Sequence, residues 1–208
     1  MVKVAPIAQP FCNWIRSRSS VSFPRPSSRG SPTGPLTTEP WVVGEVCVRA
    51  AHMKETYDRL WATQHASASP SGWHRSGDLG HFDNEGRLWV EGRVVHSIGT
   101  AHGVLTPLWI EQRFRSIDEV SAAAAVGVGP RGDQRLVAIV VPSVRIKRPR
   151  RASEHLAAAV RSTVEVDVVA VLEVPVLPVD KRHNAKVDRM RLRLWAEKVL
   201  AGGRIGKP

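Results

Sequence analysis

The sequence predicts an α+β fold, in which strand-rich segments come before a region of alternating helices and strands. Two observations lead to this prediction. Strand signals occur at residues 44–50 and again in a hairpin at 80–93. From Thr106 onward, helical periods and β-branched runs follow one another in the order αββαβα. The chain has 208 residues, of which 42% are hydrophobic and 24% charged, so residues 41–208 can bury a core.

Residues 1–40 differ in composition from the rest of the chain. They contain seven prolines and seven serines, and no hydrophobic period continues past Phe11–Ile15. This composition predicts a disordered or non-homologous N-terminal segment. A targeting peptide, also rich in Arg and Ser and poor in acids, is the alternative.

The strand-rich part contains two recognisable patterns. Residues 44–50 (GEVCVRA) alternate between apolar and polar side chains, as expected of a half-buried strand. Residues 80–93 predict a β-hairpin, because the turn residues at 83–86 (DNEG) separate two apolar stretches.

The second part begins with Thr106 and Pro107, which suit the N-cap and the first position of a helix. The last helix is expected to turn Met190, Leu194, Trp195 and Val199 inward and to end at Gly202–Gly203. Hydrophobic periods and turn residues place the elements of this part: helices near 107–116, 153–163 and 188–200, and strands near 119–128, 134–142 and 166–174.

The net charge is +11, which favours anionic partners such as nucleotides, phosphates, nucleic acid or acidic lipids. Five of the seven residues at 145–151 are basic, a pattern that suits a nucleic-acid patch, a nuclear address or a solvated loop. We favour the loop and expect no nucleic-acid partner, because no aromatic residues are interspersed and no nucleic-acid motif accompanies the run.

Membrane and redox signals are weak. The longest apolar runs are much shorter than the ~20 residues of a membrane helix, so no transmembrane segment is expected. The two cysteines, Cys12 and Cys47, have neither metal-ligand nor disulfide-scaffold spacing, which predicts a cytoplasmic location.

The most informative stretch is GWHRSGDLG at residues 72–80, which on its own is a turn leading into a strand. The motifs that follow it change this interpretation: the DNEG hairpin, Glu91-Gly92-Arg93, Ile98, Gly103, Thr106-Pro107 and Ile110-Glu111. Their order resembles the C-terminal part of the AMP-forming adenylating enzymes, which include acyl-CoA synthetases, luciferases and the adenylation domains of peptide synthetases. The resemblance spans roughly residues 41–200 and does not include 1–40.

The resemblance implies a domain organisation. Residues 41–95 would be the small β-rich end of a large N-terminal adenylating domain. Residues 96–208 would form a mobile C-terminal domain, with a three-stranded mixed sheet flanked by helices.

The resemblance also implies roles for individual residues. Asp78 matches the aspartate that binds both ribose hydroxyls of ATP or AMP, a task that suits a carboxylate because it accepts two charge-assisted hydrogen bonds. Arg93 matches an arginine that approaches the nucleotide. His96 stands at the hinge, where the family usually has Asp or Lys, and Gly103 matches the glycine of the mobile loop used in the second half-reaction.

A second motif lies at residues 175–189, PVLPVDKRHNAKVDR. It resembles the family's pattern around its catalytic lysine, with two extra residues and with His-Asn-Ala where the family has x-Ser-Gly. Lys186 would then contact the substrate carboxylate and the α-phosphate during adenylation, where an ammonium group lowers the repulsion between two anions.

One subfamily accounts for these departures. Three sequence segments resemble the β-lactone synthetases of olefin biosynthesis: HGVLTP at 102–107, LPVDKRHNAKVDR at 177–189 and WAEKVLAGGR at 195–204. Those enzymes activate a 2-alkyl-3-hydroxy fatty acid with ATP, and the acyl-adenylate closes on its own 3-hydroxyl to give a β-lactone and AMP. A fatty-acyl-CoA synthetase fragment and a non-catalytic basic interaction module are the alternatives.

The sequence lacks other motifs that this chemistry requires. The phosphate-binding loop, the acyl pocket and the glutamate motif for Mg²⁺ are not found, although the complete enzyme is expected to use Mg²⁺. We therefore interpret the chain as the last third of such an enzyme: a gene fragment, a decayed remnant, or a split subunit with a separate N-terminal adenylating half. It is expected to be inactive alone and to expose apolar surface on its strand-rich lobe.

Overall fold

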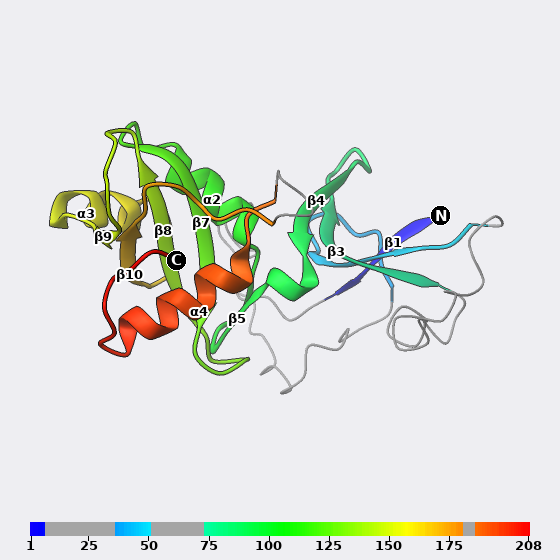
Figure 1. The fold of residues 1–208 in the computed structure, drawn as a ribbon. Coiled ribbons are helices and arrows are strands. Elements are labelled where there is room, and N and C mark those ends of the chain that lie inside the picture. Colours follow the sequence, from blue (N-terminus) through cyan, green and yellow to red (C-terminus); the bar gives the residue numbers. More distant parts are fainter. Residues whose placement is uncertain (7–35, 51–72, 181–185) are drawn as a thin grey trace. The chain divides into compact units, whose positions relative to one another are not determined.

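The computed structural model describes residues 1–6, 36–50, 73–180 and 186–208. The chain divides into two compact units. The first comprises Met1–Val95 and His102–Val104, and the second comprises His96–Ala101 and Leu105–Pro208. Strands and helices are both present, which confirms the α+β prediction (Figure 1).

The first unit contains an antiparallel sheet in the order β1-β2-β3-β4. Its strands are β1 (Val2–Pro6), β2 (Gly44–Val48), β3 (His74–Phe82) and β4 (Leu88–Arg93). Strand β1 was not expected, because it lies in the segment 1–40 that the composition predicts to be disordered. Its five residues pair with β2, which supplies a partner that composition does not reveal. Residues 7–35 of that segment lie outside the described residues.

Strand β2 is buried more fully than its alternating pattern predicts. Val46 belongs to an apolar cluster with Val4 and Phe82, whereas Cys47 belongs to another with Ala5 and Trp73. Successive side chains of a strand point to opposite faces, so both faces of β2 are covered. The half-buried prediction is therefore wrong for this strand.

The predicted hairpin is present, with β3 and β4 joined by the turn at residues 83–86. Asp83 is buried at this turn and accepts hydrogen bonds from Arg87 Nε at 2.6 Å and Trp89 Nε1 at 2.8 Å. Burial opposes the ionisation of Asp83, but the hydrogen bonds from Trp89 and Arg87 outweigh it and hold its pKa well below the usual range. This ionised side chain fixes the geometry of the hairpin.

The second unit is built on a mixed sheet in the order β7-β8-β10-β9. Its strands are β7 (Val120–Val128), β8 (Arg135–Pro142), β9 (Arg150–Arg151) and β10 (Val168–Glu173). Strand β10 is parallel to β8, and the other two pairings are antiparallel. Three of the strands were predicted. The fourth, β9, lies in the basic run that was expected to be a loop, and two residues are too few to show a period.

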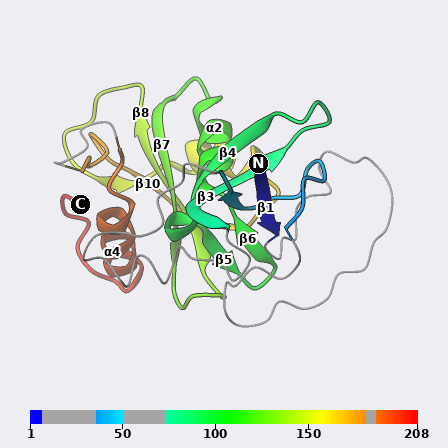
Figure 2. The same ribbon diagram turned by 90° about the vertical axis from the view of Figure 1, so that its right-hand side faces the viewer.

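Helices cover both faces of this sheet. They are α2 (Pro107–Arg115), α3 (Glu154–Ser162) and α4 (Arg189–Leu200). Alternate residues of β8 join different clusters: Leu136 packs with residues of α2 and α3, whereas Val137 packs with residues of α4. Figure 2 accordingly shows α2 and α4 on opposite sides of β7 and β8. Burial on both faces explains why β8 is a continuous apolar run.

Two details of the helices differ from the predictions. Met190 and Leu194 are exposed, because the buried stripe of α4 consists of Leu192, Trp195, Ala196 and Val199. Pro107 is the first residue of α2 as predicted, but the side chain of Thr106 makes no capping hydrogen bond. The predicted end of α4 is confirmed, since Gly202 adopts a φ of 88° and the Gly203 N–H donates to the Lys198 carbonyl at 2.9 Å.

Candidate functional site

Asp78 and Arg93 face each other across the β3–β4 hairpin. They are paired in the strand register, and Arg93 Nη1 donates to Asp78 Oδ1 at 3.0 Å. The Asp78 side chain is 34% exposed, so its carboxylate can also accept hydrogen bonds from a ligand. The hairpin therefore presents a carboxylate and a guanidinium side by side at its surface.

The backbone next to Asp78 is held by a residue that the sequence analysis did not single out. Gly77 has a φ of 74°, and its N–H donates to Glu45 Oε1 at 3.2 Å. Glu45 is buried and also accepts a hydrogen bond from Arg75 Nε at 2.8 Å. A Cβ at Gly77 would lie 3.3 Å from Arg93 Nη2, so a glycine keeps room for the guanidinium. The sequence signal that could have identified Glu45 is an acidic residue within an otherwise apolar strand.

The predicted hinge and loop residues lie at the boundary between the units. His96 ends a short 3₁₀ turn (Val94–His96). Gly103 begins β6 (Gly103–Leu105), which forms a two-stranded sheet with β5 (Ile98–Thr100). Gly103 is buried and has a φ of 125°, a conformation that favours glycine.

Lys186 lies in the second unit, next to an isolated antiparallel bridge between Val179 and Val187. Its carbonyl accepts a hydrogen bond from the Asp180 N–H at 2.9 Å, and the Asp188 N–H donates to the Pro178 carbonyl at 2.8 Å. Residues 181–185 lie outside the described part of the chain. Lys186 is exposed.

A buried ion pair anchors the segment that follows Lys186. Arg189 Nη2 donates to the two oxygens of Glu111 at 2.8 and 2.7 Å, and the Ala125 N–H donates to Oε1 at 3.0 Å. Burial raises the pKa of Glu111, and the Arg189 guanidinium and the Ala125 N–H offset part of that rise. These contacts join α2, β7 and the first turn of α4, so the Glu111–Arg189 pair holds the chain three residues after Lys186.

The structure thus brings Asp78 and Arg93 together in the first unit, and it places Lys186 in the second. Among the described residues, no group of three or more His, Cys, Asp or Glu side chains is arranged to hold a metal ion. None of the helices in this part of the chain is long and apolar enough to cross a membrane.

Comparison with known proteins places these features in context. No protein-family model matches the chain. An olefin β-lactone synthetase of Stenotrophomonas maltophilia is 35% identical over 172 residues, which cover 80% of this chain and 29% of that protein. An indoleacetate–CoA ligase of Aromatoleum aromaticum is 36% identical over 107 residues, covering 50% of this chain and 20% of the ligase.

A solved structure agrees with these relatives. The amide bond synthetase of Marinactinospora thermotolerans superposes with a TM-score of 0.65 at 28% identity, covering 80% of this chain and 33% of that one. The chain thus spans about three tenths of the length of the β-lactone synthetase that it matches. From its sequence and its fold, the chain belongs to the superfamily of AMP-forming adenylating enzymes, which includes the olefin β-lactone synthetases.

Proposed function

We propose that the chain is the C-terminal part of an ATP-dependent, AMP-forming ligase that activates carboxylic acids. The observation that carries this proposal is the Asp78–Arg93 pair, within the motif that resembles the ribose site of the family. Arg93 bonds one oxygen of Asp78, and the side chain is exposed enough for the second oxygen to accept from a ligand. A carboxylate that can accept two charge-assisted hydrogen bonds fits a ribose diol.

Lys186 is the residue that we assign to the adenylation step. In that step a carboxylate oxygen of the acid attacks the α-phosphorus of ATP, and the bond to pyrophosphate breaks. The Lys186 ammonium group would stabilise the charge that builds between the two anions. His96 would serve as the pivot between half-reactions, and Gly103 would belong to the loop used in the second one.

The substrate that we propose is a 2-alkyl-3-hydroxy fatty acid. The 3-hydroxyl oxygen would attack the acyl carbon of the adenylate and lose its proton, and AMP would leave as the β-lactone closes. The similarity to an olefin β-lactone synthetase supports this assignment. The similarity to an indoleacetate–CoA ligase favours a second candidate, in which the thiol of CoA attacks the same carbon.

The proposed domains are residues 41–95, the end of a large adenylating domain, and 96–208, a mobile C-terminal domain. A larger N-terminal part, on the same or another chain, would supply the phosphate loop and the acyl pocket. Exposed apolar side chains on β4 support such a partner: Leu88, Trp89 and Val90. The described residues do not fit a Mg²⁺ site, so no step is assigned to that ion here. We place the protein in the cytoplasm, which the cysteine usage favours.

The test compares the 208-residue chain with a hybrid in which residues 41–208 replace the matching region of the Stenotrophomonas enzyme. We expect no ATP–pyrophosphate exchange from the chain alone and exchange from the hybrid. In the hybrid, Lys186→Ala should slow exchange by roughly 10²–10³-fold, whereas Lys198→Ala, an exposed lysine of α4, should not. Pyrophosphate release unchanged in Lys186→Ala would mean that the alignment across the two-residue insertion is wrong.

Nucleotide binding tests the first unit separately. Asp78→Ala should weaken AMP binding by about tenfold or more, because charge-assisted hydrogen bonds contribute ~1.5–3 kcal/mol. The matched control is Asp133→Ala, which removes a carboxylate from a turn in the second unit. Product analysis of the hybrid, for β-lactone or acyl-CoA, separates the two candidate second steps.

A further inference from the structure

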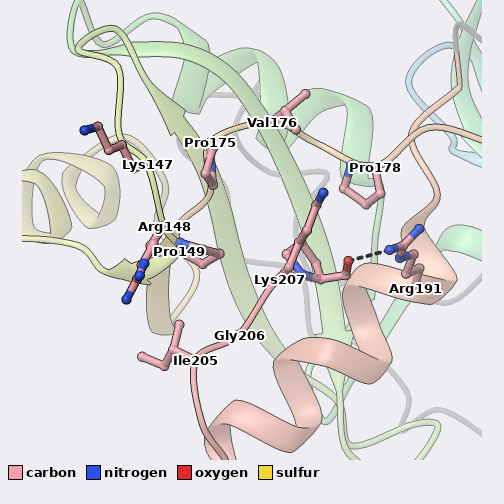
Figure 3. Close-up of a pocket in the computed structure, with 11 residues that line it drawn as sticks. Lys147, Arg148, Pro149, Pro175, Val176, Pro178, Arg191, Ile205, Gly206 and Lys207 are labelled. Carbon is pink, nitrogen blue, oxygen red and sulfur yellow. Dashed lines mark hydrogen bonds between the residues drawn. The ribbon is translucent and has the colours of Figure 1, made fainter.

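The second unit contains a pocket that the proposed function does not use. Its volume is about 660 Å³, and its lining includes none of Asp78, Arg93 or Lys186. The walls come from the loop after β8, the segment after β10, the first turn of α4 and the C-terminal residues. Figure 3 shows Lys147 and Arg148 on one side of the pocket and Arg191 and Lys207 on the other.

The charged side chains that line this pocket are all basic. No acidic residue lines it, and within the described residues Lys147, Arg148 and Lys207 form no ion pair. Arg191 Nη2 donates to the Pro208 carbonyl at 2.6 Å (Figure 3). By contrast, Arg150, in the same basic run, is neutralised by the buried carboxylate of Glu173. Guanidinium and ammonium groups together favour a ligand with more than one negative charge, such as a phosphate.

The rest of the lining is apolar. It consists of three prolines and two aliphatic residues: Pro149, Pro175, Pro178, Val176 and Ile205. The apolar lining would add no binding free energy for an inorganic anion, whereas it favours a ligand that buries apolar surface against it. The basic side chains favour a ligand with a phosphate group, and the apolar lining favours a ligand in which that phosphate is attached to an apolar group.

We propose that this pocket binds a phosphate monoester that carries an apolar chain or ring. The four basic groups point in different directions in Figure 3. Their long side chains are flexible, so the ligand would draw them together on its phosphate. The proposal does not depend on the ligase activity, because no residue assigned to that activity lines the pocket.

Trp195 can report the binding of a ligand in this pocket. Trp195 Nε1 donates to the carbonyl of Gly206 at 2.8 Å, and Gly206 lines the pocket. Ligand binding should therefore shift the indole N–H resonance of Trp195, which a Trp195→Phe variant assigns among the seven tryptophans.

The test is calorimetric titration of the full chain with octyl phosphate and with inorganic phosphate, at 0.15 M salt to screen distant charges. Octyl phosphate should bind about tenfold more tightly than inorganic phosphate. The double variant Lys147→Ala/Arg148→Ala should weaken both by about tenfold or more. Arg145→Ala/Arg151→Ala, which removes the same charge from the same run outside the pocket, should change them less than about twofold.

A second pair of variants tests the apolar wall. Val176→Ser should weaken octyl phosphate about threefold and leave inorganic phosphate unchanged. The matched control is Val144→Ser, since Val144 is 78% exposed and Val176 64%, and only Val176 lines the pocket. This control should leave both affinities unchanged.

Three results would overturn the proposal. Equal weakening by the two double variants would show attraction to general surface charge. An unshifted Trp195 resonance at saturation would place the ligand elsewhere. Cosedimentation with vesicles of phosphatidic acid, without binding of monomeric octyl phosphate, would identify a bilayer surface and exclude a free ester as the ligand.

Discussion

The Glu111–Arg189 pair gives a prediction whose size can be worked from the structure. Glu111 is 4% exposed and accepts hydrogen bonds from the Arg189 guanidinium and the Ala125 N–H. Strand β7 lies at the edge of its sheet, so an N–H that does not face β8 needs another acceptor. Glu111→Ala removes the acceptor of both groups at once.

The expected loss of unfolding free energy is about 3 kcal/mol. Removing one partner of a buried ion pair costs ~3–5 kcal/mol, because the other charge is left uncompensated. The lower end applies here, since the Arg189 side chain is 20% exposed and water can reach part of it. In the double variant Glu111→Leu/Arg189→Met no charge is left unpaired. About 1–3 kcal/mol should remain, from the unsatisfied Ala125 N–H.

Urea titration followed by far-UV circular dichroism measures this loss, because α2, α3 and α4 all lie in the second unit. Glu197→Ala is the matched control. It breaks the more exposed Arg193–Glu197 pair and should cost no more than about 0.5 kcal/mol. A loss below ~1 kcal/mol for Glu111→Ala would refute the reasoning. So would separate costs of Glu111→Leu and Arg189→Met that simply add in the double variant.

Three further predictions concern single residues. Because the pKa of Asp83 is lowered in the folded state, its ionised side chain stabilises the fold above its unfolded pKa of ~3.9, and this stabilisation is lost as the pH falls. The melting temperatures of wild type and Asp83→Asn should therefore converge toward pH 2. A difference between them that stays constant with pH would contradict this prediction. Gly127→Ala should cost ~1–3 kcal/mol in urea titration, because a Cβ would lie 2.7 Å from Ile98 Cγ2; an unchanged midpoint contradicts this. Ser153→Ala should cost ~1 kcal/mol by losing the cap bond to the Leu156 N–H, and a stability equal to wild type would show that the cap is not needed.

Local patterns were sufficient where each residue's environment is set by its chain neighbours. The hairpin followed from its DNEG turn, and the end of α4 followed from two glycines. Within the candidate site, Asp78 and Arg93 are named through the family resemblance, and one short hairpin places them opposite each other.

Other features depend on residues distant in sequence, and local patterns could not predict them. Glu45 supports Gly77 from 32 positions away, and β9 exists because β10 lies beside it. Met190 and Leu194 fit an apolar face as well as Leu192 and Ala196 do, and only packing against the sheet selects between the faces.

The sequence by itself determined the superfamily motifs, the positive charge and most of the helices and strands, because these depend on short-range order and composition. The tertiary structure decided which charges are compensated. Arg189 and Arg150 each pair with a buried glutamate, whereas Lys147 and Arg148 line a pocket that has no acidic side chain. The physical reason is that a charge interacts with its neighbours in space, and folding brings those neighbours from distant parts of the chain.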